Sequence, residues 1–213
     1  MLDVADGRRT SRVPLVALAV GVAAALGAAW LLLAPAGDDL PGMTRVPAPD
    51  VSDVRLLDHA GPAGPREVDL LPPPNGLTFV YFGYLSCPDV CPTTMADIAR
   101  ARREVGEAAG ERTRVAFVTV DPERDGPDRL RGYLEAFFGP GQLALSAPSH
   151  EALAAAADRF GVRWEIEAHA PGEDYDVAHT AVTYVIDDRG TVVRELPFGV
   201  PWTDFAAVMR ALL

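Results

Sequence analysis

Short apolar runs along the chain predict buried β-strands. The run at 77–84 is rich in β-branched and aromatic residues. The run at 113–120 holds a continuous apolar stretch, which is typical of a strand covered on both faces. Shorter runs predict the remaining extended segments, which are 51–59 and 66–70 as an entry hairpin, 143–145, 162–168, and a closing hairpin of 181–186 and 192–196.

Apolar residues recurring three or four positions apart predict the helices. These are expected at 92–108, through 130–138, at 150–160 and at 202–212. Ser149 and Gly161 are suited to cap the two ends of the third helix. In the first helix Met95 lies in the apolar stripe, so we interpret it as a core residue and not as a copper thioether ligand.

The order of these elements predicts an α/β sandwich with a parallel start and an antiparallel finish. Strand and helix alternate twice, and a further helix, a hairpin and a closing helix follow. This order resembles that of the thioredoxin-like fold. We therefore expect a thioredoxin-like sandwich behind an N-terminal transmembrane anchor.

The first fifty residues predict that anchor and a linker. Three arginines precede an apolar run at 13–36, which is long enough to cross a hydrocarbon core of about 30 Å. Because basic residues favour the cytoplasmic side, we expect residues 1–12 in the cytoplasm and a single-pass helix at 13–36 in the cell membrane. A linker rich in Pro, Gly and Asp at 37–50 then leads to an extracytoplasmic domain at 51–213. Cleavage at the Ala-Pro-Ala sequence near the end of the run is the alternative.

Composition excludes two classes of protein. The net charge is −11 and every basic side chain other than histidine is arginine, so the chain is a poor nucleic-acid binder. Two cysteines are too few for a disulfide framework or for a Cys-only zinc site.

Both cysteines, Cys87 and Cys91, lie where the 77–84 strand ends and a helix begins. Backbone N–H groups and the helix dipole favour thiolates at such a place. At this spacing the Cα atoms would lie about 6 Å apart on a helical turn, which suits a disulfide or a shared metal. The pair is therefore a candidate for redox chemistry, for metal binding or for both. A purely structural disulfide is not favoured, because closing so short a loop removes little chain entropy.

His179 is the candidate third chemical residue. It directly precedes the strand at 181–186, and by analogy with the thioredoxin-like fold the loop entering that strand lies against the Cys turn. We interpret His59 as solvated, His150 as a neutral surface residue and His169 as part of a loop. Two thiolates and one imidazole suit copper, and zinc would also accept them.

The sequence resembles the Sco/SenC family of membrane-anchored, thioredoxin-like copper proteins over roughly residues 47–212. The matching motifs are Phe82-Gly83-Tyr84, Cys87-Pro88-Asp89-Val90-Cys91-Pro92-Thr93-Thr94, Asp121-Pro122-Glu123-Arg124-Asp125 and Tyr175-Asp176-Val177-Ala178-His179-Thr180. The resemblance implies a copper metallochaperone that binds one copper, as Cu(I), Cu(II) or both, through Cys87, Cys91 and His179. It also implies delivery of copper to the dinuclear copper centre of cytochrome c oxidase, or reduction of the thiols there.

The implied partners are the copper-bearing subunit of that oxidase, a thiol reductant or periplasmic copper donor, and the membrane through the N-terminal helix. One departure is Ala178, where the family usually has an aspartate that could orient the imidazole. Glu173, Asp174 and Asp176 are candidates to replace it. The 121–125 turn is explained equally well as a helix cap or as a contributor to the field at the thiolates.

Two other functions stay open. A thiol-disulfide oxidoreductase would use Cys87 and Cys91 as a redox-active pair, although their spacing is one residue longer than in Cys-x-x-Cys enzymes. A redox or copper sensor would bind a partner in only one state of the cysteines. A peroxidase is less favoured, because the turn is built for two cysteines.

Overall fold

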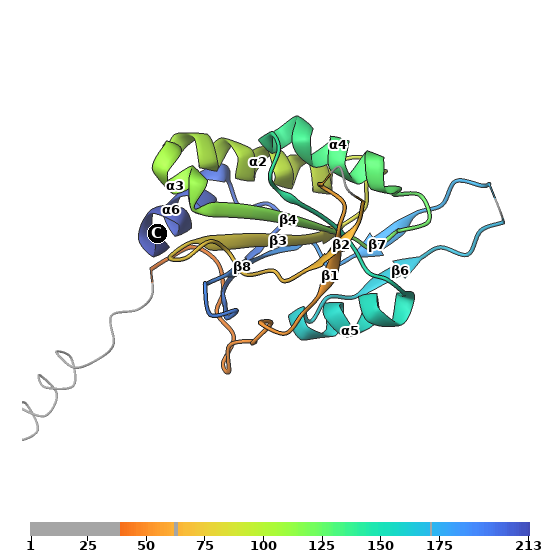
Figure 1. Cartoon of the computed structure of the whole chain (residues 1–213), viewed down its shortest axis with the longest axis horizontal. Helices are drawn as coiled ribbons and strands as arrows, with labels where there is room; N and C mark the ends of the chain where they lie inside the picture. Colours follow the sequence, from red (N-terminus) through yellow and green to blue (C-terminus); the bar gives the residue numbers. More distant parts are fainter. Residues whose placement is uncertain (1–38, 62–63, 171) are drawn as a thin grey trace, which may run out of the picture. The chain divides into compact units, whose positions relative to one another are not determined.

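The computed structural model describes residues 39–61, 64–170 and 172–213 of the chain (Figure 1). Within them lies a sheet of seven strands in the order β2-β1-β5-β4-β3-β8-β9. In chain order its strands are β1 (Leu56–Asp58), β2 (Arg66–Val68), β3 (Leu77–Gly83), β4 (Thr113–Thr119), β5 (Leu143–Ser146), β8 (Val182–Ile186) and β9 (Val192–Pro197). The helices are α2 (Val90–Glu104), α3 (Glu107–Glu111), α4 (Pro127–Phe138), α5 (His150–Phe160) and α6 (Trp202–Leu212).

The predicted anchor at 13–36 and the basic N-terminus at 1–12 lie outside the described residues. Among the residues that are described, no helix has both the length and the apolar character needed to cross a bilayer.

The directions of the strands confirm the predicted sandwich. Strand β3 is parallel to β4, and β4 is parallel to β5. On the other side β3 is antiparallel to β8, and β8 is antiparallel to β9. The carboxyl ends of β3 and β4 therefore lie side by side, and the segments that follow them share one edge of the sheet.

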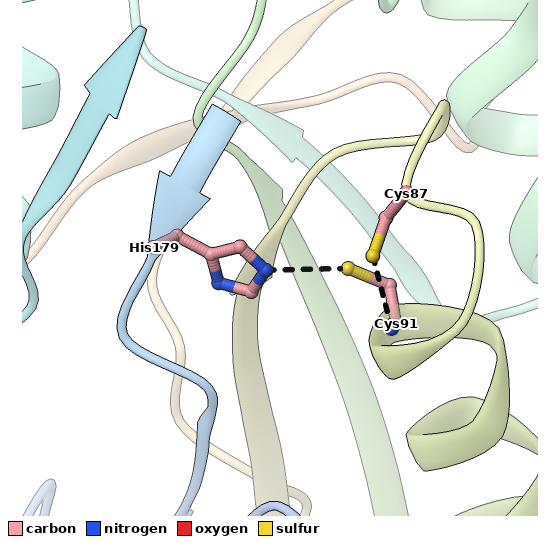
Figure 2. Close-up of side chains that lie close together, drawn as sticks. All are labelled: Cys87, Cys91 and His179. Atoms are coloured by element: carbon pink, nitrogen blue, oxygen red, sulfur yellow. Dashed lines mark hydrogen bonds between the residues drawn. The ribbon is translucent and has the colours of Figure 1, made fainter. Parts of the chain in front are cut away.

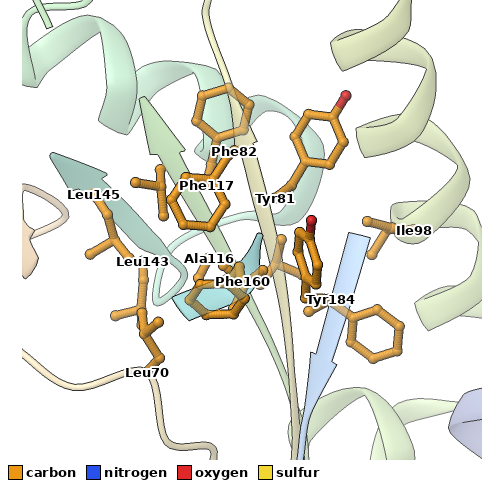
Figure 3. Close-up of a cluster of buried hydrophobic side chains, with 14 of the residues drawn as sticks. Leu70, Tyr81, Phe82, Ile98, Ala116, Phe117, Leu143, Leu145, Phe160 and Tyr184 are labelled. Atoms are coloured by element: carbon orange, nitrogen blue, oxygen red, sulfur yellow. The ribbon is translucent and has the colours of Figure 1, made fainter. Parts of the chain in front are cut away.

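Side chains of β3 alternate between the two faces of the sheet. Phe79 packs on Phe205 of α6, with ring centroids 6.3 Å apart, and Phe82 packs on Phe160 of α5 at 5.2 Å. Helices α2, α4 and α6 cover one face and α5 covers the other (Figure 1). Figure 3 shows part of the resulting core, which includes Phe82 and Phe160 together with Leu143 and Leu145 of β5. Burying each such side chain contributes roughly 1.5–3 kcal/mol.

The first predicted helix is two helices. Helix α2 ends at Glu104 and α3 begins at Glu107, and Gly106 between them has a φ of 89°. Glycine adopts such a positive φ readily, and it breaks the regular path of an α-helix. The prediction that one helix continues to 108 and stops before Gly110 is wrong, because Gly106 already ends it and Gly110 lies inside α3.

The entry hairpin is confirmed but is shorter than predicted. Strand β1 lies between β2 and β5 and not at the edge of the sheet. His59 follows β1 and is only 7% exposed, and its Nε2 lies 2.7 Å from the hydroxyl of Ser146. The expectation of a solvated His59 is therefore wrong, because β5 covers the end of the entry strand.

Part of the predicted linker is attached to β9. The backbone of Met43 exchanges two hydrogen bonds of 2.9 Å with that of Glu195, and Asp50 forms a bridge with Thr191. Arg45 forms an ion pair with Glu195 and donates a 2.7 Å hydrogen bond to the carbonyl of Phe160. The compact unit accordingly begins at residue 40.

Candidate metal centre

Strand β3 carries the chain to the first two candidate ligands. All seven of its residues are buried, and the strand ends at Gly83. The backbone N–H of Cys87 then donates a 3.3 Å hydrogen bond to the carbonyl of Tyr84, which closes a turn. This turn places Cys87 at the rim of the fold, where it is 8% exposed.

Helix α2 begins directly after the turn and carries the second ligand. Cys91 is its second residue and is fully buried. The N–H of Cys91 donates to Sγ of Cys87 at 3.4 Å, so a free amide of the first helical turn points at the outer sulfur. Both cysteines are free thiols.

The third candidate ligand comes from a strand that the sequence did not predict. Segment β6 (Trp164–Ile166), within the predicted extended stretch, pairs antiparallel with β7 (Val177–His179). His179 is the last residue of β7, opposite Trp164. Its Nε2 lies 3.5 Å from Sγ of Cys91, across a sequence separation of 88 residues (Figure 2).

The imidazole of His179 is held on three sides. Its Nδ1 lies 3.2 Å from the carbonyl of Thr180, and because a carbonyl only accepts, Nδ1 carries the proton and Nε2 presents a lone pair to the sulfurs. The rings of Tyr81 and Tyr84 meet it edge-on, with centroids 5.9 and 5.8 Å away. The carbonyl of Thr180 takes the orienting role that was expected of a carboxylate. The hydrogen bonds of the His179 ring involve none of the acidic residues at 173–176.

Burial sets the protonation of the inner ligands. It raises the pKa of the Cys91 thiol to about 12 and outweighs the backbone hydrogen bond that acts in the opposite direction. The expected stabilisation of both thiolates by the start of the helix therefore does not hold at Cys91. Burial likewise lowers the pKa of His179, which keeps its imidazole neutral and able to bind a metal.

The three side chains together fit one soft metal ion. Two sulfurs and Nε2 of His179 all lie within 4.8 Å of one another. With metal–sulfur and metal–nitrogen bonds of about 2.3 and 2.0 Å, a tetrahedral ion would separate sulfur from nitrogen by about 3.5 Å, which matches the distance between Sγ of Cys91 and Nε2 of His179. Thiolate and imidazole ligands select copper and zinc over hard cations such as magnesium. Within the described residues this is the one such group of three that could share an ion.

The other candidate residues lie outside this group. His150 and His169 are exposed, as expected of surface residues, and His169 stacks on Tyr175. Met95 is fully buried in the core, which confirms its interpretation as a packing residue. In the 121–125 turn, Arg124 pairs with Asp121 at 2.5 Å.

Comparison with known proteins identifies the family. A family model described as SCO1/SenC matches residues 67–213, more than half of the chain. The chain belongs to the SCO1/SenC family. This confirms the resemblance that the cysteine, Asp-Pro and histidine motifs carried.

Relatives of this SCO1/SenC chain agree in sequence and in fold. The SCO2-like protein RP587 of Rickettsia prowazekii is 31% identical over 119 residues, which cover 55% of this chain and 57% of that protein. The chain thus spans little more than half the length of that relative. The solution structure of apo Sco1 from Thermus thermophilus matches with a TM-score of 0.66 and 31% identity, covering 83% of this chain and 100% of that one. The structure of Bradyrhizobium japonicum ScoI with copper bound matches with a TM-score of 0.62 and 29% identity, covering 75% and 97%.

Residues that support the site in this SCO1/SenC chain were harder to predict than the ligands. A Cβ added at Gly83 would lie 2.9 Å from Sγ of Cys91, so glycine makes room for the inner sulfur. Tyr175 hydrogen-bonds through its hydroxyl to Asp121 at 2.8 Å. Both residues stand inside family motifs, but the contacts that explain them cross between distant segments.

Proposed function

We propose that this protein is a copper chaperone that binds one copper through Cys87, Cys91 and His179. We propose further that it delivers this copper to the dinuclear copper centre of cytochrome c oxidase. The observation that carries the proposal is the convergence of two thiols and a neutral imidazole nitrogen within 4.8 Å. The copper-bound ScoI from B. japonicum, which has the same fold, supports copper over zinc.

Access to the site suits a protein that passes its metal on. Cys91 is fully enclosed, whereas Cys87 is 8% exposed and His179 is half-buried. An incoming thiolate or imidazole of a partner can therefore approach from the side of Cys87. Replacing ligands one at a time keeps the copper coordinated throughout the transfer.

The test is a Cu(I) titration of the full chain in detergent, reduced and anaerobic, against a chromophoric chelator. We expect one copper per chain. His179→Ala is expected to lower the affinity by about tenfold or more, equivalent to at least 1.4 kcal/mol. His150→Ala is the matched control, because that histidine is exposed and lies outside the site. Unchanged stoichiometric binding by Cys87→Ala or Cys91→Ala would refute the copper site.

Delivery needs a separate measurement. The loaded chain is mixed with the metal-free copper-bearing subunit of cytochrome c oxidase, the two are separated, and copper is counted in each. Movement of copper to the subunit supports delivery. Retention of all copper by the loaded chain would leave a binding protein and refute the chaperone role.

The sulfur geometry also favours a second candidate, a thiol-disulfide oxidoreductase. The outer thiolate of Cys87 would attack a target disulfide, and Cys91 would then displace the target, leaving a Cys87–Cys91 disulfide and a target reduced by two electrons. An external thiol reductant would reset the pair. This reaction does not need the imidazole as a ligand, so His179→Ala should keep reductase activity while losing copper affinity. Failure of both wild type and His179→Ala to reduce a target disulfide would exclude it.

We propose, from the pattern of residues 1–36 alone, that the chain is anchored in the cell membrane with its domain on the extracytoplasmic face. Proteolysis of spheroplasts tests this location. Digestion of the domain without lysis is expected, and protection until lysis would contradict the proposal.

A further inference from the structure

The 121–125 turn contacts both segments that carry the candidate ligands. Its first contact is with the cysteine turn. Oδ2 of Asp125 accepts hydrogen bonds from the backbone N–H of Leu85, at 3.0 Å, and from the hydroxyl of Thr119, at 2.7 Å. Asp125 is 2% exposed, and Leu85 lies between the end of β3 and Cys87. This carboxyl group therefore fixes the backbone that leads into the outer cysteine.

The second contact is with the hairpin of β6 and β7, which we call the His179 hairpin. Nε of Arg124 donates to Oδ2 of Asp121 at 2.5 Å, and its Nη1 donates to the carbonyl of Tyr175 at 2.8 Å. The hydroxyl of Tyr175 donates to Oδ1 of Asp121 at 2.8 Å. The guanidinium also stacks on the ring of Tyr175, with Cζ 3.5 Å from the centroid. These bonds close a ring of interactions between the turn and Tyr175, which lies two residues before β7.

Burial makes the loss of any bond in this ring costly. Asp121 has no exposed surface. One of its carboxylate oxygens accepts a hydrogen bond from Arg124, and the other accepts one from Tyr175. A buried carboxylate without partners is strongly disfavoured, so Asp121 holds Arg124 and Tyr175 in place. Arg124 itself is far more buried than an ordinary surface arginine, with 19% of its side chain exposed.

The His179 hairpin needs such an attachment. Strands β6 and β7 form a sheet of their own, with three residue pairs, and do not join the seven-stranded sheet. They extend from the edge of the domain (Figure 1). A two-stranded hairpin is marginally stable by itself, so its position depends on contacts at its base. Arg124 also lies 5.8 Å from the centroid of Tyr84, the ring that meets His179 edge-on.

We propose that the 121–125 turn sets the distance between the cysteine turn and the His179 hairpin. In this view Asp121, Arg124, Asp125 and Tyr175 are positioning residues for the metal site and do not touch the metal. The inference rests on the proposed function, from which it takes that the site binds copper. Its geometrical part, the placement of His179, can be measured without metal.

The variants are chosen to loosen the hairpin without unfolding the domain. Tyr175→Phe removes the hydroxyl bonded to Asp121 and keeps the stacked ring. Arg124→Lys keeps the charge beside Asp121 and loses the planar group that reaches Tyr175. Tyr133→Phe is the matched control, because the hydroxyl of Tyr133 is buried without a hydrogen-bond partner and the residue lies on α4.

Two measurements are made on the full chain. The first is Cu(I) affinity by chelator competition, with each variant also made in the His179→Ala background. The expected result is a loss of about tenfold in affinity for Tyr175→Phe and for Arg124→Lys, and none for Tyr133→Phe. In the His179→Ala background the same two changes should have no further effect, because the turn acts through His179.

The second measurement is the ¹H–¹⁵N spectrum of the histidine rings in the reduced, metal-free protein. We expect the His179 signals to shift or broaden in Tyr175→Phe and Arg124→Lys and to be unchanged in Tyr133→Phe. A merely structural role would instead weaken copper binding equally in both backgrounds, and that result would overturn the proposal. Wild-type affinity in both variants would also overturn it.

Failure of the wild type to bind copper would refute the proposed function and not the positioning role. The ring spectra then decide. Unchanged His179 signals in both variants would overturn the placement of His179 by the turn, and displaced signals would support it.

Discussion

Gly83 is the residue at which one methyl group should damage the site most. It ends β3 with a strand backbone that alanine adopts freely, so Gly83→Ala adds only volume. The new Cβ would lie 2.9 Å from Sγ of Cys91 and 2.9 Å from Cε1 of Tyr81. It would also lie 3.1 Å from Cζ of Phe117. Optimal carbon contacts are about 3.5 Å, so two neighbours must each retreat by roughly 0.6 Å.

All three neighbours lie in the buried core. Cys91 and Phe117 are fully buried and Tyr81 is 1% exposed. Overpacking of this kind costs about 1–3 kcal/mol, and the stiffer unfolded chain of an alanine variant returns about 0.4–1 kcal/mol. We therefore expect Gly83→Ala to lower the free energy of unfolding by about 1–2 kcal/mol. Displacement of Sγ from its place beside His179 should also lower Cu(I) affinity by about tenfold.

The matched control is Gly132→Ala, the same chemical change in the middle of α4. Apart from the adjoining backbone of α4, no atom lies within 4 Å of the Cβ it would add, and helix propensity predicts a gain of about 1 kcal/mol. The assay is urea denaturation of the reduced, metal-free full chain, followed by the copper titration. The two variants should shift the midpoint in opposite directions. A Gly83→Ala protein as stable as the wild type, with the same copper affinity, would refute the packing argument.

Three further changes test other parts of the structure. Met95→Leu conserves the volume of a fully buried side chain, so it should cost less than about 1.5 kcal/mol and leave copper stoichiometry unchanged, and loss of copper would instead make Met95 a ligand. Ser149→Ala removes the 3.1 Å cap to the N–H of Ala152 and should cost about 1 kcal/mol in denaturation without affecting copper, whereas no loss would mean that the cap is not formed in solution. Burial raises the pKa of the Cys91 thiol from its ordinary value of 9.0 to about 12, so the folded state favours the neutral thiol. The stability that this preference adds to the folded state is complete below pH 9 and is lost as the pH rises toward 12. The denaturation midpoint of the reduced, metal-free protein should fall across that range more steeply than that of Cys91→Ala, and equal slopes would contradict this.

The central sheet could be predicted because its strands carry their own signal. The runs that became β3 and β4 are apolar over most of their length, and only a position between two helical layers suits such strands. The closing hairpin was marked by polar residues between two apolar runs, and it is present as β8 and β9. These elements are encoded locally, so periodicity and turn chemistry were sufficient.

The errors occurred where distant contacts decide the structure. Nothing in the local pattern separates Gly106 from Gly110 as the end of the first helix, because either glycine can adopt a positive φ, and the structure has it at Gly106. His59 looked solvated because the sequence does not tell that β5 pairs beside β1. Residues 43–50 have the composition of a linker, yet their backbone finds partners on β9.

The metal site shows the same difference between residues placed by local sequence and residues placed by distant contacts. The cysteines are four residues apart on one turn, so their proximity follows from the sequence itself. His179 is 88 residues from Cys91, and its proximity to the sulfurs could be predicted only by analogy with the thioredoxin-like fold and from the family resemblance. Its place depends on β7, a strand of three residues that has too little apolar pattern to be predicted. The sequence alone thus brings the two sulfurs together, whereas the position of the imidazole depends on the tertiary structure. The affinity for a metal depends on how firmly the fold holds that one histidine against the cysteine turn.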